Sequence, residues 1–263
     1  MKNSSDYNWQ LPAFETLELA SRQGKYALVI PVINEGERIH AQLARIAALK
    51  ERPDTIVADG GSTDGSLDQA FLVEQGVRTR LTKTGPGKLS AQLRMAYAYC
   101  LREGYEGVIT IDGNGKDGVD AIAAFVARLD AGDDYVQGSR YALGGQAVNT
   151  PLDRAFANRM IHAPLLSLAS GKKLTDTTNG FRAYSARFLL DPRVAPFRSV
   201  FDRYELLFYL TVRAGQLKYR VSELPVLRAY PEGEKPPTKI NGWRARLSVL
   251  RQTVDAAAGR FNP

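Results

Sequence analysis

The chain has 263 residues, of which 44% are hydrophobic and 24% are charged, and its formal net charge is +7 at pH 7. These values are ordinary for a globular protein, and the length allows a full core in one large or two small domains. The single cysteine, Cys100, excludes an internal disulfide and a cysteine-rich metal cluster. No apolar run approaches the roughly 18 residues that a membrane-spanning helix requires.

The positive charge is concentrated near the end of the chain. Residues 228–263 hold seven Lys/Arg against three Asp/Glu, a bias that favours anionic partners such as phosphates or acidic lipids. The basic residues do not alternate with a regular aromatic series, and no nucleic-acid-binding motif is present, so we expect no nucleic-acid partner. Residues 1–12 lack the apolar core of a signal peptide. We therefore expect a cytoplasmic protein, either free or on the inner face of the membrane.

The first half of the chain alternates between strand and helix patterns. Residues 1–24 are predicted to be an N-terminal extension with a short helix at 14–21, and residues 25–227 to be the main domain. Repeated strand–helix units of this spacing predict an α/β fold with a mainly parallel sheet and right-handed crossovers. The predicted strands are 26–32, 55–58, 77–81, 108–111 and 134–139, and the predicted helices are 36–49, 66–75, 88–103 and 121–130.

The second half is less regular. A helix is predicted at 152–170, kinked near Pro164 and ending at Gly171, because proline lacks the N–H of a helix interior and glycine suits a helix C-cap. Further predictions are strands at 181–185 and 219–226, a helix at 204–214, and a basic loop with an amphipathic helix over 228–263. We find no linker that would divide the chain into two independent domains.

A polar turn follows the strand predicted at 108–111. Its residues are Asp112, Gly113, Asn114 and Gly115, and the glycines let the backbone turn tightly so that two oxygen-bearing side chains can converge. Asp and Asn offer hard oxygen ligands that suit Mg²⁺ or Mn²⁺ beside a diphosphate. The alternative is an ordinary β-turn, since this composition is good turn chemistry by itself.

Two earlier loops also follow predicted strands. The first is Pro31-Val-Ile-Asn-Glu35, whose Asn34 and Glu35 present polar groups at the carboxyl edge of the sheet; its alternative role is to cap the next helix. The second begins Asp59-Gly-Gly61, where a carboxylate can accept hydrogen bonds from a base or ribose. Neither GxGxxG nor GxxxxGK[ST] occurs, so NAD enzymes and P-loop NTPases lose support.

Taken together, these loops resemble the inverting family 2 glycosyltransferases of GT-A fold, in particular the dolichyl- or polyprenyl-phosphate branch. The resemblance continues through Gly138-Ser-Arg140, Asp176-Thr-Thr-Asn-Gly-Phe-Arg182 and Tyr204-Glu-Leu-Leu207, and covers about residues 25–245. It implies a metal site at Asp112 and Asn114. The nucleotide-binding residues that it implies are Pro31, Asn34, Glu35, Asp59, Gly61, Lys88 and Asp112.

The chain departs from the family pattern at three points. Asn114 stands where the family's second metal-binding position is acidic, and a neutral ligand weakens the site unless a neighbour such as Asp117 compensates. The catalytic base is not plain, with Glu205 or Asp202 near its expected place. The C-terminal transmembrane helices of several relatives are also missing from this sequence.

The missing base has a chemical interpretation. A hydroxyl acceptor needs a carboxylate to take its proton, whereas a lipid phosphate is already anionic and needs cations to position it. The predicted phosphate holders are Arg140, Arg182, Lys235 and Lys239. The catalytic candidates are Asp176, which acts on a hydroxyl acceptor or orients the donor sugar, together with Arg182 and Glu205. For Arg182 the alternative is a structural ion pair.

The last predicted helix is amphipathic. From Trp243 onward, Leu247, Leu250 and Val254 fall on one face, flanked by arginines such as Arg246. Such a helix suits a membrane interface whose acidic headgroups meet the arginines. The alternatives are an ordinary helix packed on the domain and a contact in a homodimer, since surface helices share this period.

These observations predict a metal-dependent inverting glycosyltransferase that uses Mg²⁺ or Mn²⁺. The expected donor is a nucleotide sugar, UDP-linked rather than GDP-linked, and the expected acceptor is a polyprenyl phosphate or, second, a saccharide hydroxyl, in cell-envelope glycan synthesis. The alternative is a catalytically degenerate protein that binds a nucleotide sugar and regulates. A nucleotidyltransferase is disfavoured because no glycine-rich basic loop occurs near residues 30–40.

Overall fold

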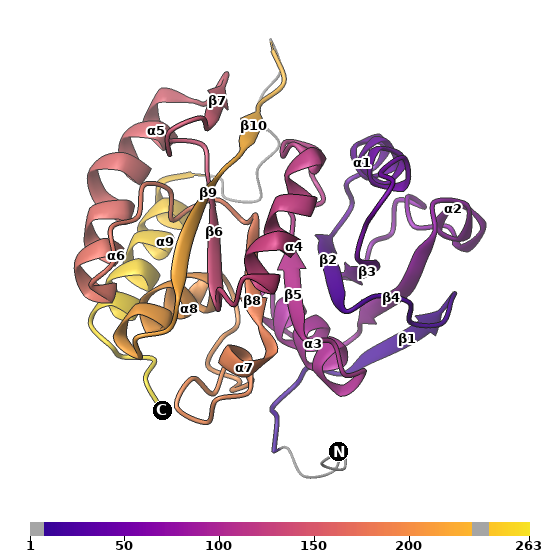
Figure 1. Cartoon of the computed structure of the whole chain (residues 1–263), viewed down its shortest axis with the longest axis horizontal. Helices are drawn as coiled ribbons and strands as arrows, with labels where there is room; N and C mark the ends of the chain where they lie inside the picture. Colours follow the sequence, from indigo (N-terminus) through magenta and orange to yellow (C-terminus); the bar gives the residue numbers. More distant parts are fainter. Residues whose placement is uncertain (1–7, 233–241) are drawn as a thin grey trace.

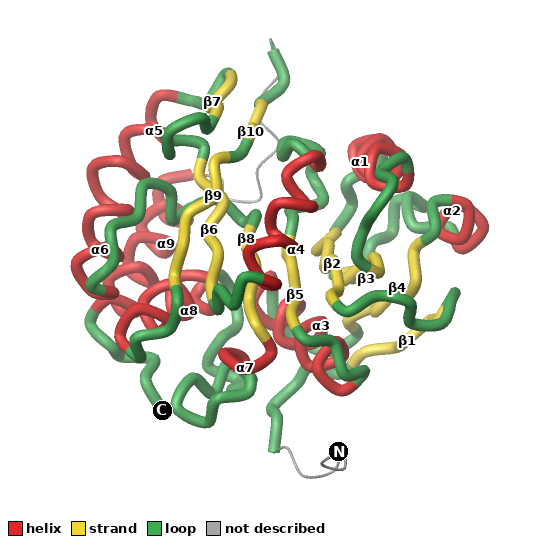
Figure 2. The backbone as a smooth tube through the Cα atoms, in the orientation of Figure 1, coloured by secondary structure: helices red, strands yellow, loops and turns green. Residues whose placement is uncertain are grey.

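A mixed sheet forms the centre of the molecule (Figures 1 and 2). The computed structural model describes residues 8–232 and 242–263. Within those ranges the sheet has eight strands, and a separate parallel pair is formed by β7 (Gln146–Val148) and β10 (Leu227–Ala229). In spatial order the eight strands are β1 (Phe14–Glu18), β4 (Val77–Lys83), β3 (Asp54–Asp59), β2 (Tyr26–Val32), β5 (Gly107–Thr110), β8 (Arg182–Ser185), β6 (Tyr135–Ser139) and β9 (Val221–Pro225).

The strand order contains a switch point beside β2. Strands β2, β3 and β4 run parallel in sequence on one side, and the chain then returns to place β5 parallel to β2 on the other side. The loops that follow β2 and β5 therefore diverge at neighbouring carboxyl ends, which is where open α/β sheets bind ligands. Strand β8 is antiparallel to both β5 and β6, so the sheet is mainly but not wholly parallel.

Helices cover both faces of the sheet because alternate strand residues point to opposite sides. Leu28 and Ile30 pack toward α1 (Glu37–Ala47), α2 (Gln69–Glu74) and α4 (Ile122–Asp130). Ala27 and Val29 belong to the other core, with α3 (Leu89–Arg102), α7 (Ala186–Leu189) and α8 (Glu205–Gln216). Cys100 is buried in this second core.

A further helical layer packs on α8. It consists of α5 (Leu152–Ala157), a π-helical turn (Asn158–His162), α6 (Ala163–Ser170) and α9 (Gly242–Ala257), and Figure 1 shows α6 and α9 beside α8. Gly171 caps α6 with φ 66°, which confirms the predicted helix end. The predicted interruption takes the form of the π-helical turn just before Pro164, whose missing N–H the altered hydrogen-bond pattern accommodates.

The helix predicted at 14–21 is wrong. Phe14–Glu18 is strand β1, which pairs antiparallel with the edge of β4. The spacing of Phe14 and Leu17 suits a helix, but β4 offers a row of backbone groups to pair with, and Tyr99 donates a hydrogen bond to Glu18 at 2.9 Å. Tertiary pairing thus overrides local spacing. The cap of α1 also differs from prediction, because Gly36, at φ 53°, occupies the N-cap in place of Asn34.

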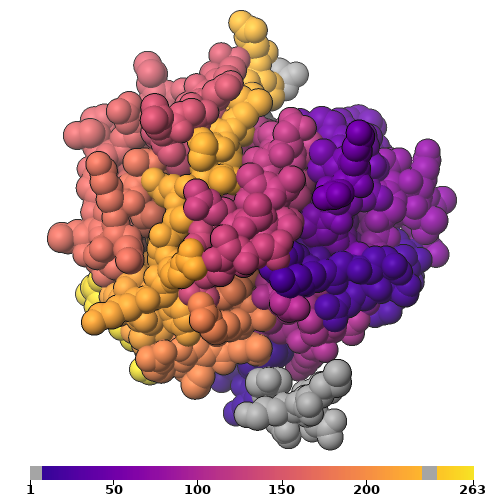
Figure 3. Space-filling view, viewed as in Figure 1, coloured from indigo at the N-terminus to yellow at the C-terminus, as the bar shows by residue number. Residues whose placement is uncertain are grey.

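The surface view shows the two halves of the chain packed against each other, with the segment around β10 projecting at the top edge (Figure 3). In the ranges that the structure describes, we find no helix with both the length and the apolar character needed to cross a bilayer.

Candidate active site

A large pocket begins where β2 and β5 end and extends to α5 and α9. It encloses about 1220 Å³. We call its two parts the strand side, which includes Pro31, Glu35, Lys88 and Asp112, and the helix side, which includes Arg154, Ile161, Trp243, Arg246 and Leu247. Among the described residues, nine Lys/Arg and three Asp/Glu line the pocket, so its lining favours an anionic ligand.

The first two loops of the strand side are tied together by side-chain hydrogen bonds. Asn34 Oδ1 accepts from the backbone N–H of Thr63 at 2.8 Å, and Ser62 Oγ accepts from the N–H of Asn34 at 3.1 Å. Asp59 is buried and accepts from the N–H groups of Gly61 and Ser62. Pro31, Glu35 and Lys88 line the pocket directly, whereas Asn34, Asp59 and Gly61 hold the loops in shape behind it. Their nucleotide-binding roles stay predictions.

Asp112 lies where β5 reaches the switch point. Its neighbour Gly113 donates a backbone hydrogen bond to the carbonyl of Pro31 at 3.3 Å, which joins the loops after β2 and β5. A Cβ at Gly180 would lie 2.2 Å from Asp112 Oδ1, so only glycine leaves room for this carboxylate. The NGFR segment therefore contributes a seat for Asp112, and the Asp112 side chain stays 24% exposed toward the pocket.

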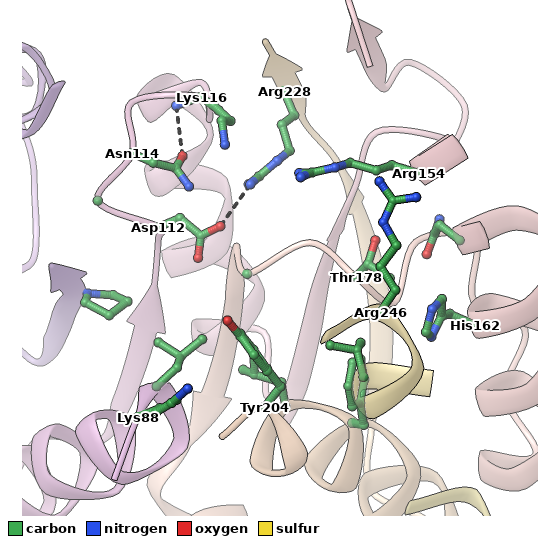
Figure 4. A pocket seen from close by; sticks show the side chains of 18 of the residues that line it. Lys88, Asp112, Asn114, Lys116, Arg154, His162, Thr178, Tyr204, Arg228 and Arg246 are labelled. Carbon is green, nitrogen blue, oxygen red and sulfur yellow. Dashed lines mark hydrogen bonds and ion pairs between the residues drawn. The ribbon is translucent and has the colours of Figure 1, made fainter. Parts of the chain in front are cut away.

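Arg228 reaches the same point from β10. Its Nη2 donates to Asp112 Oδ2 at 2.9 Å (Figure 4). Its Nη1 donates to both oxygens of Asp117, at 2.9 and 2.7 Å, and to Asn179 Oδ1 at 3.0 Å. Burial lowers the pKa of Arg228, but the carboxylates of Asp117 and Asp112 raise it by more than burial lowers it. The pKa of Arg228 therefore lies well above its usual value. Arg228 is a permanent, fixed positive charge.

Lys116 and Tyr230 complete this cluster. The ammonium of Lys116 lies 4.8 Å from the centre of the Tyr230 ring. Burial, with Arg228 next, lowers the pKa of Lys116 to about 8. Burial raises the pKa of Tyr230, but the charges of Arg228, Arg140 and Arg154 outweigh it and bring the value to about 8. A phenol pKa this low indicates a strongly positive local field.

The predicted metal ligands Asp112 and Asn114 both line the pocket, but they do not make a complete cation site. Within the described ranges, His, Cys, Asp and Glu form no group of three that could hold a metal. One oxygen of Asp112 is engaged by Arg228, and Asn114 Oδ1 accepts from the backbone N–H of Lys116 at 3.4 Å. The chain thus offers a divalent cation one carboxylate and one amide beside two cationic side chains. Hard cations normally take more oxygen ligands than this.

Arg140 and Arg182 line the pocket, and Asp176 lies buried behind Arg140. Arg140 donates to both oxygens of Asp176, at 2.6 and 3.2 Å, and both side chains are buried. Arg182 is fully buried, and its guanidinium donates to the carbonyls of Asn179, Leu207 and Thr177. This placement favours a structural role for Arg182 over contact with a phosphate. The role differs from the predicted alternative of a structural ion pair, because the partners of Arg182 are backbone carbonyls and not a carboxylate.

The two carboxylates considered as a base lie at the start of α8. Glu205 Oε2 accepts from the backbone N–H groups of Asp202 and Arg203, at 3.1 and 2.5 Å, and so fixes the turn that precedes the helix. The neighbouring Tyr204, and not Glu205, lines the pocket. Glu205 thus holds this turn and does not face an acceptor in the pocket. The role of Glu205 as a base remains a prediction without support from its contacts.

Two arginines on the helix side were not singled out for this site. Arg154 lies on α5, its guanidinium 5.7 Å from the centre of the Tyr230 ring, and Arg246 on α9 pairs with Asp153 at 2.8 Å. In Figure 4, Arg154 extends across the pocket toward Arg228, which itself points to Asp112. No motif surrounds Arg154, so the fold was needed to find it. Lys235 and Lys239, two of the predicted phosphate holders, lie outside the described residues.

Comparison with known proteins agrees with this architecture. The family "Glycosyl transferase family 2" matches residues 27–191. The chain is 26% identical to a polyprenol monophosphomannose synthase of Mycolicibacterium smegmatis, over 89% of this chain and 88% of that protein. It is 27% identical to an undecaprenyl-phosphate mannosyltransferase of Micrococcus luteus, over 89% of this chain and 94% of that protein.

Solved structures show the same fold. A glucosyl-3-phosphoglycerate synthase from Mycobacterium tuberculosis in complex with Mg²⁺ and UDP superposes with a TM-score of 0.63 at 17% identity, covering 89% of this chain and 78% of that one. The complex of that enzyme with Mn²⁺, UDP and glucosyl-3-phosphoglycerate gives a TM-score of 0.61 at 18% identity, covering 89% and 79%. The chain therefore belongs to glycosyl transferase family 2 and has the GT-A fold.

Proposed function

We propose that this glycosyltransferase moves a sugar from a nucleoside-diphosphate donor to a polyprenyl phosphate. The observation that carries the proposal is the continuity of the pocket, which runs from the loops at the switch point to a pair of arginines beside exposed apolar side chains. The two mannosyltransferase relatives, whose names specify polyprenol and undecaprenyl phosphate, support this acceptor.

The donor fits the strand side. Open α/β sheets bind nucleotides at such a switch point, and Pro31, Glu35 and Lys88 line the pocket there. UDP stays the predicted nucleotide, and the UDP complexes of the structurally similar synthase are compatible with it. The mannosyltransferase relatives favour a mannosyl donor. The transfer assay described below therefore compares UDP-linked and GDP-linked sugars as donors.

The acceptor phosphate fits the helix side. Arg154 and Arg246 both line the pocket, and guanidinium groups pair with phosphate oxygens through two parallel hydrogen bonds. Arg154 extends toward Arg228 and Asp112 in Figure 4, so a phosphate held by it lies next to the place of the donor sugar. Arg154 thus takes the role that the sequence assigned to Arg140 and Arg182.

The lipid tail fits the rim of this side. Leu152, Phe156 and Met160 follow one another at spacings of four along the helix and are 87%, 63% and 63% exposed. Trp243 and Leu247 on α9 are 70% and 57% exposed, and the ion pair between Asp153 and Arg246 joins the two helices. Exposed apolar rows of this size mark lipid or protein contacts. They support the predicted membrane contact of α9, while Gln252, Thr253 and Ala256 form its packed face.

The chemistry requires no general base for this acceptor. An oxygen of the lipid phosphate attacks the anomeric carbon, the bond from that carbon to the diphosphate oxygen breaks, and the nucleoside diphosphate leaves with the electron pair. Attack opposite the leaving group inverts the configuration. A hydroxyl acceptor would need a base, and Glu205 is already occupied by two backbone amides, so the phosphate acceptor is favoured.

The predicted Mg²⁺ or Mn²⁺ receives mixed support. The similar synthase was solved with Mn²⁺ or Mg²⁺ beside UDP, which favours a divalent cation. Were such an ion bound, Asp112 and Asn114 would be the residues to hold it, and it would supply Lewis-acid chemistry at the leaving diphosphate. The incomplete donor set around Asp112 argues against it.

A transfer assay tests the proposal. The full chain is incubated with labelled UDP- and GDP-linked hexoses and with undecaprenyl phosphate in anionic vesicles, with Mn²⁺ or with EDTA, and label is counted in the organic extract. We expect transfer from one donor to undecaprenyl phosphate and none to undecaprenol, which lacks the phosphate. Donor binding without transfer would instead support the regulatory alternative, which the family match does not favour. Transfer to a saccharide hydroxyl alone would contradict the proposed acceptor.

A further inference from the structure

We propose that Arg228 and Lys116 neutralise the diphosphate of the donor in this chain, and that binding and transfer require no divalent cation. The inference rests on the proposed function, because it assigns residues to the diphosphate of a nucleotide-sugar donor. It differs from the metal-dependent prediction that the family resemblance implies.

The first reason is the set of ligands around Asp112. At the position where the family places a second acidic residue, the chain has Asn114, and Lys116 follows two residues later. Asp117 does not compensate, because it is fully buried and both of its oxygens accept from Arg228. A divalent cation would therefore gain one shared carboxylate and lie close to two positive side chains. Coulomb repulsion from these side chains opposes its binding.

The second reason is that Arg228 is held rigidly before any ligand binds. Asp117 and Asn179 fix one end of its guanidinium from behind, while Asp112 accepts from the other end at the pocket surface. Its Nε has no hydrogen-bond partner among the described residues. A positive charge placed in advance stabilises a departing anion without reorganisation, which is the property that a bound metal would otherwise supply.

The third reason is the balance of charge. The lining holds nine Lys/Arg against three Asp/Glu, and adding the buried Asp117 and Asp176 behind it still leaves nine against five. A diphosphate therefore brings the pocket closer to neutrality without a metal ion. Lys116 and Arg228 are the cations beside Asp112, with Arg154 across the pocket (Figure 4).

Isothermal calorimetry of the full chain tests the inference. UDP and GDP are titrated separately into the protein in EDTA and again with excess Mn²⁺. We expect the Kd of the preferred nucleotide to agree within about threefold between the two conditions, a difference well below one decade of affinity. Binding of Mn²⁺ to the protein without nucleotide is measured by electron paramagnetic resonance, because bound Mn²⁺ reduces the signal of the free ion. We expect no such reduction at micromolar concentrations of Mn²⁺.

Two variants connect the result to named residues. Lys116→Gln removes the charge and keeps most of the side-chain length, and we expect its nucleotide Kd in EDTA to rise about tenfold, as for the loss of one charged contact. Lys173→Gln is the matched control, because Lys173 is exposed and does not line the pocket. Its Kd should equal that of the wild type.

The outcomes separate the two proposals. Nucleotide binding that appears only with Mn²⁺, or a Lys116→Gln variant that binds as tightly as Lys173→Gln, would overturn the inference and leave the proposed function standing. Failure of both UDP and GDP to bind in either condition would overturn both proposals. Tight binding in EDTA that is weakened by Lys116→Gln supports the inference.

Discussion

The two sides of the pocket are built in different ways. On the strand side, side chains hold backbone loops in place, as Asn34 and Asp59 do through hydrogen bonds to successive N–H groups. On the helix side, α5 and α9 are joined by the Asp153–Arg246 ion pair, whose side chains are 47% and 64% exposed. Exposed ion pairs contribute only about 0–1 kcal/mol, so this contact at the rim adds little stability, and α9 is held chiefly by its packed face on α6 and α8.

The difference corresponds to what each side binds in the proposed reaction. The diphosphate and the reacting carbon need fixed geometry, because misplacement reduces the rate of transfer. A lipid tail needs only an apolar surface and a phosphate contact, and the exposed apolar side chains of α5 and α9 offer that surface. We therefore expect substitutions on the strand side to affect turnover and substitutions on the helix side to affect acceptor affinity.

The largest effect is expected for Asp112→Asn. This change removes a charge next to Arg228 in a seat that Gly180 keeps open, so the placed cation loses its partner at the pocket surface. We expect kcat/KM for transfer to fall by about 100-fold or more, because a misplaced Arg228 no longer stabilises the leaving diphosphate. Asp120→Asn, which alters an exposed carboxylate of the same segment, is the control. Activity of Asp112→Asn within a few-fold of this control would contradict the assigned centre.

A smaller effect on the strand side is expected for Asn114→Asp. The change restores the acidic position of the family pattern and gives a cation a second carboxylate. We expect Mn²⁺ to raise the activity of this variant about tenfold over its own value in EDTA, because carboxylate charge tunes affinity for hard cations. The activity of the wild type, assayed in parallel, should rise by less than about threefold when Mn²⁺ replaces EDTA. Equal stimulation of the wild type and the variant by Mn²⁺ would contradict the claim that Asn114 weakens cation binding at this site.

On the helix side, Arg154→Gln is expected to raise the KM for undecaprenyl phosphate. Loss of one guanidinium contact to a phosphate weakens binding by about tenfold, while the Kd of the nucleotide should change little. Arg251→Gln is the matched control, since Arg251 is exposed on α9, pairs with Asp255 and does not line the pocket. A fall in kcat with unchanged acceptor KM would instead place Arg154 with the donor.

Much of the strand side could be predicted from the sequence, because its signals are local. Apolar β-branched runs predicted strands β2 to β6, and the polar residues directly after β2, β3 and β5 marked the loops that the structure brings together. Pairing partners are not local, so neither the edge strand β1 nor the antiparallel insertion of β8 between β5 and β6 could be read from spacing.

The roles of the arginines show where sequence reasoning ends. Arg182 stands in a conspicuous motif, yet its guanidinium is enclosed by two carbonyls of that same motif, Thr177 and Asn179, and by the carbonyl of Leu207 on α8. Arg154 and Arg228 stand in no motif, and only the packing of α5 and β10 brings Arg228 to Asp112 and Arg154 into the same pocket. Whether an arginine faces a ligand or a carbonyl depends on contacts far away in sequence.

A smaller effect is expected when the rim loses its apolar side chains. Replacing both Trp243 and Leu247 by serine should reduce co-sedimentation with anionic vesicles that carry undecaprenyl phosphate by about threefold, since interfacial binding scales with buried apolar area. The Kd for the nucleotide should stay unchanged. Leu168→Ser is the control, because Leu168 is 83% exposed on α6 but does not line the pocket. Equal losses for the control would show that the surface as a whole, and not this rim, meets the lipid.

The smallest effect is a pH dependence of stability that arises at His162. Burial lowers the pKa of His162 from its usual value of 6.5, and its Nδ1 forms a 2.9 Å hydrogen bond with Thr253 Oγ1 of α9. Between the folded pKa and 6.5 the unfolded chain binds more protons, so stability rises with pH through that window and is lost as the pH falls below 6.5. We expect the free energy of unfolding, measured by urea denaturation, to fall by less than about 1 kcal/mol from pH 7 to pH 6. In the His162→Gln variant this decrease should be absent. If His162→Gln keeps the same pH dependence, the acid sensitivity belongs to other groups, and the contact between α9 and the π-helical turn is not what weakens on acidification.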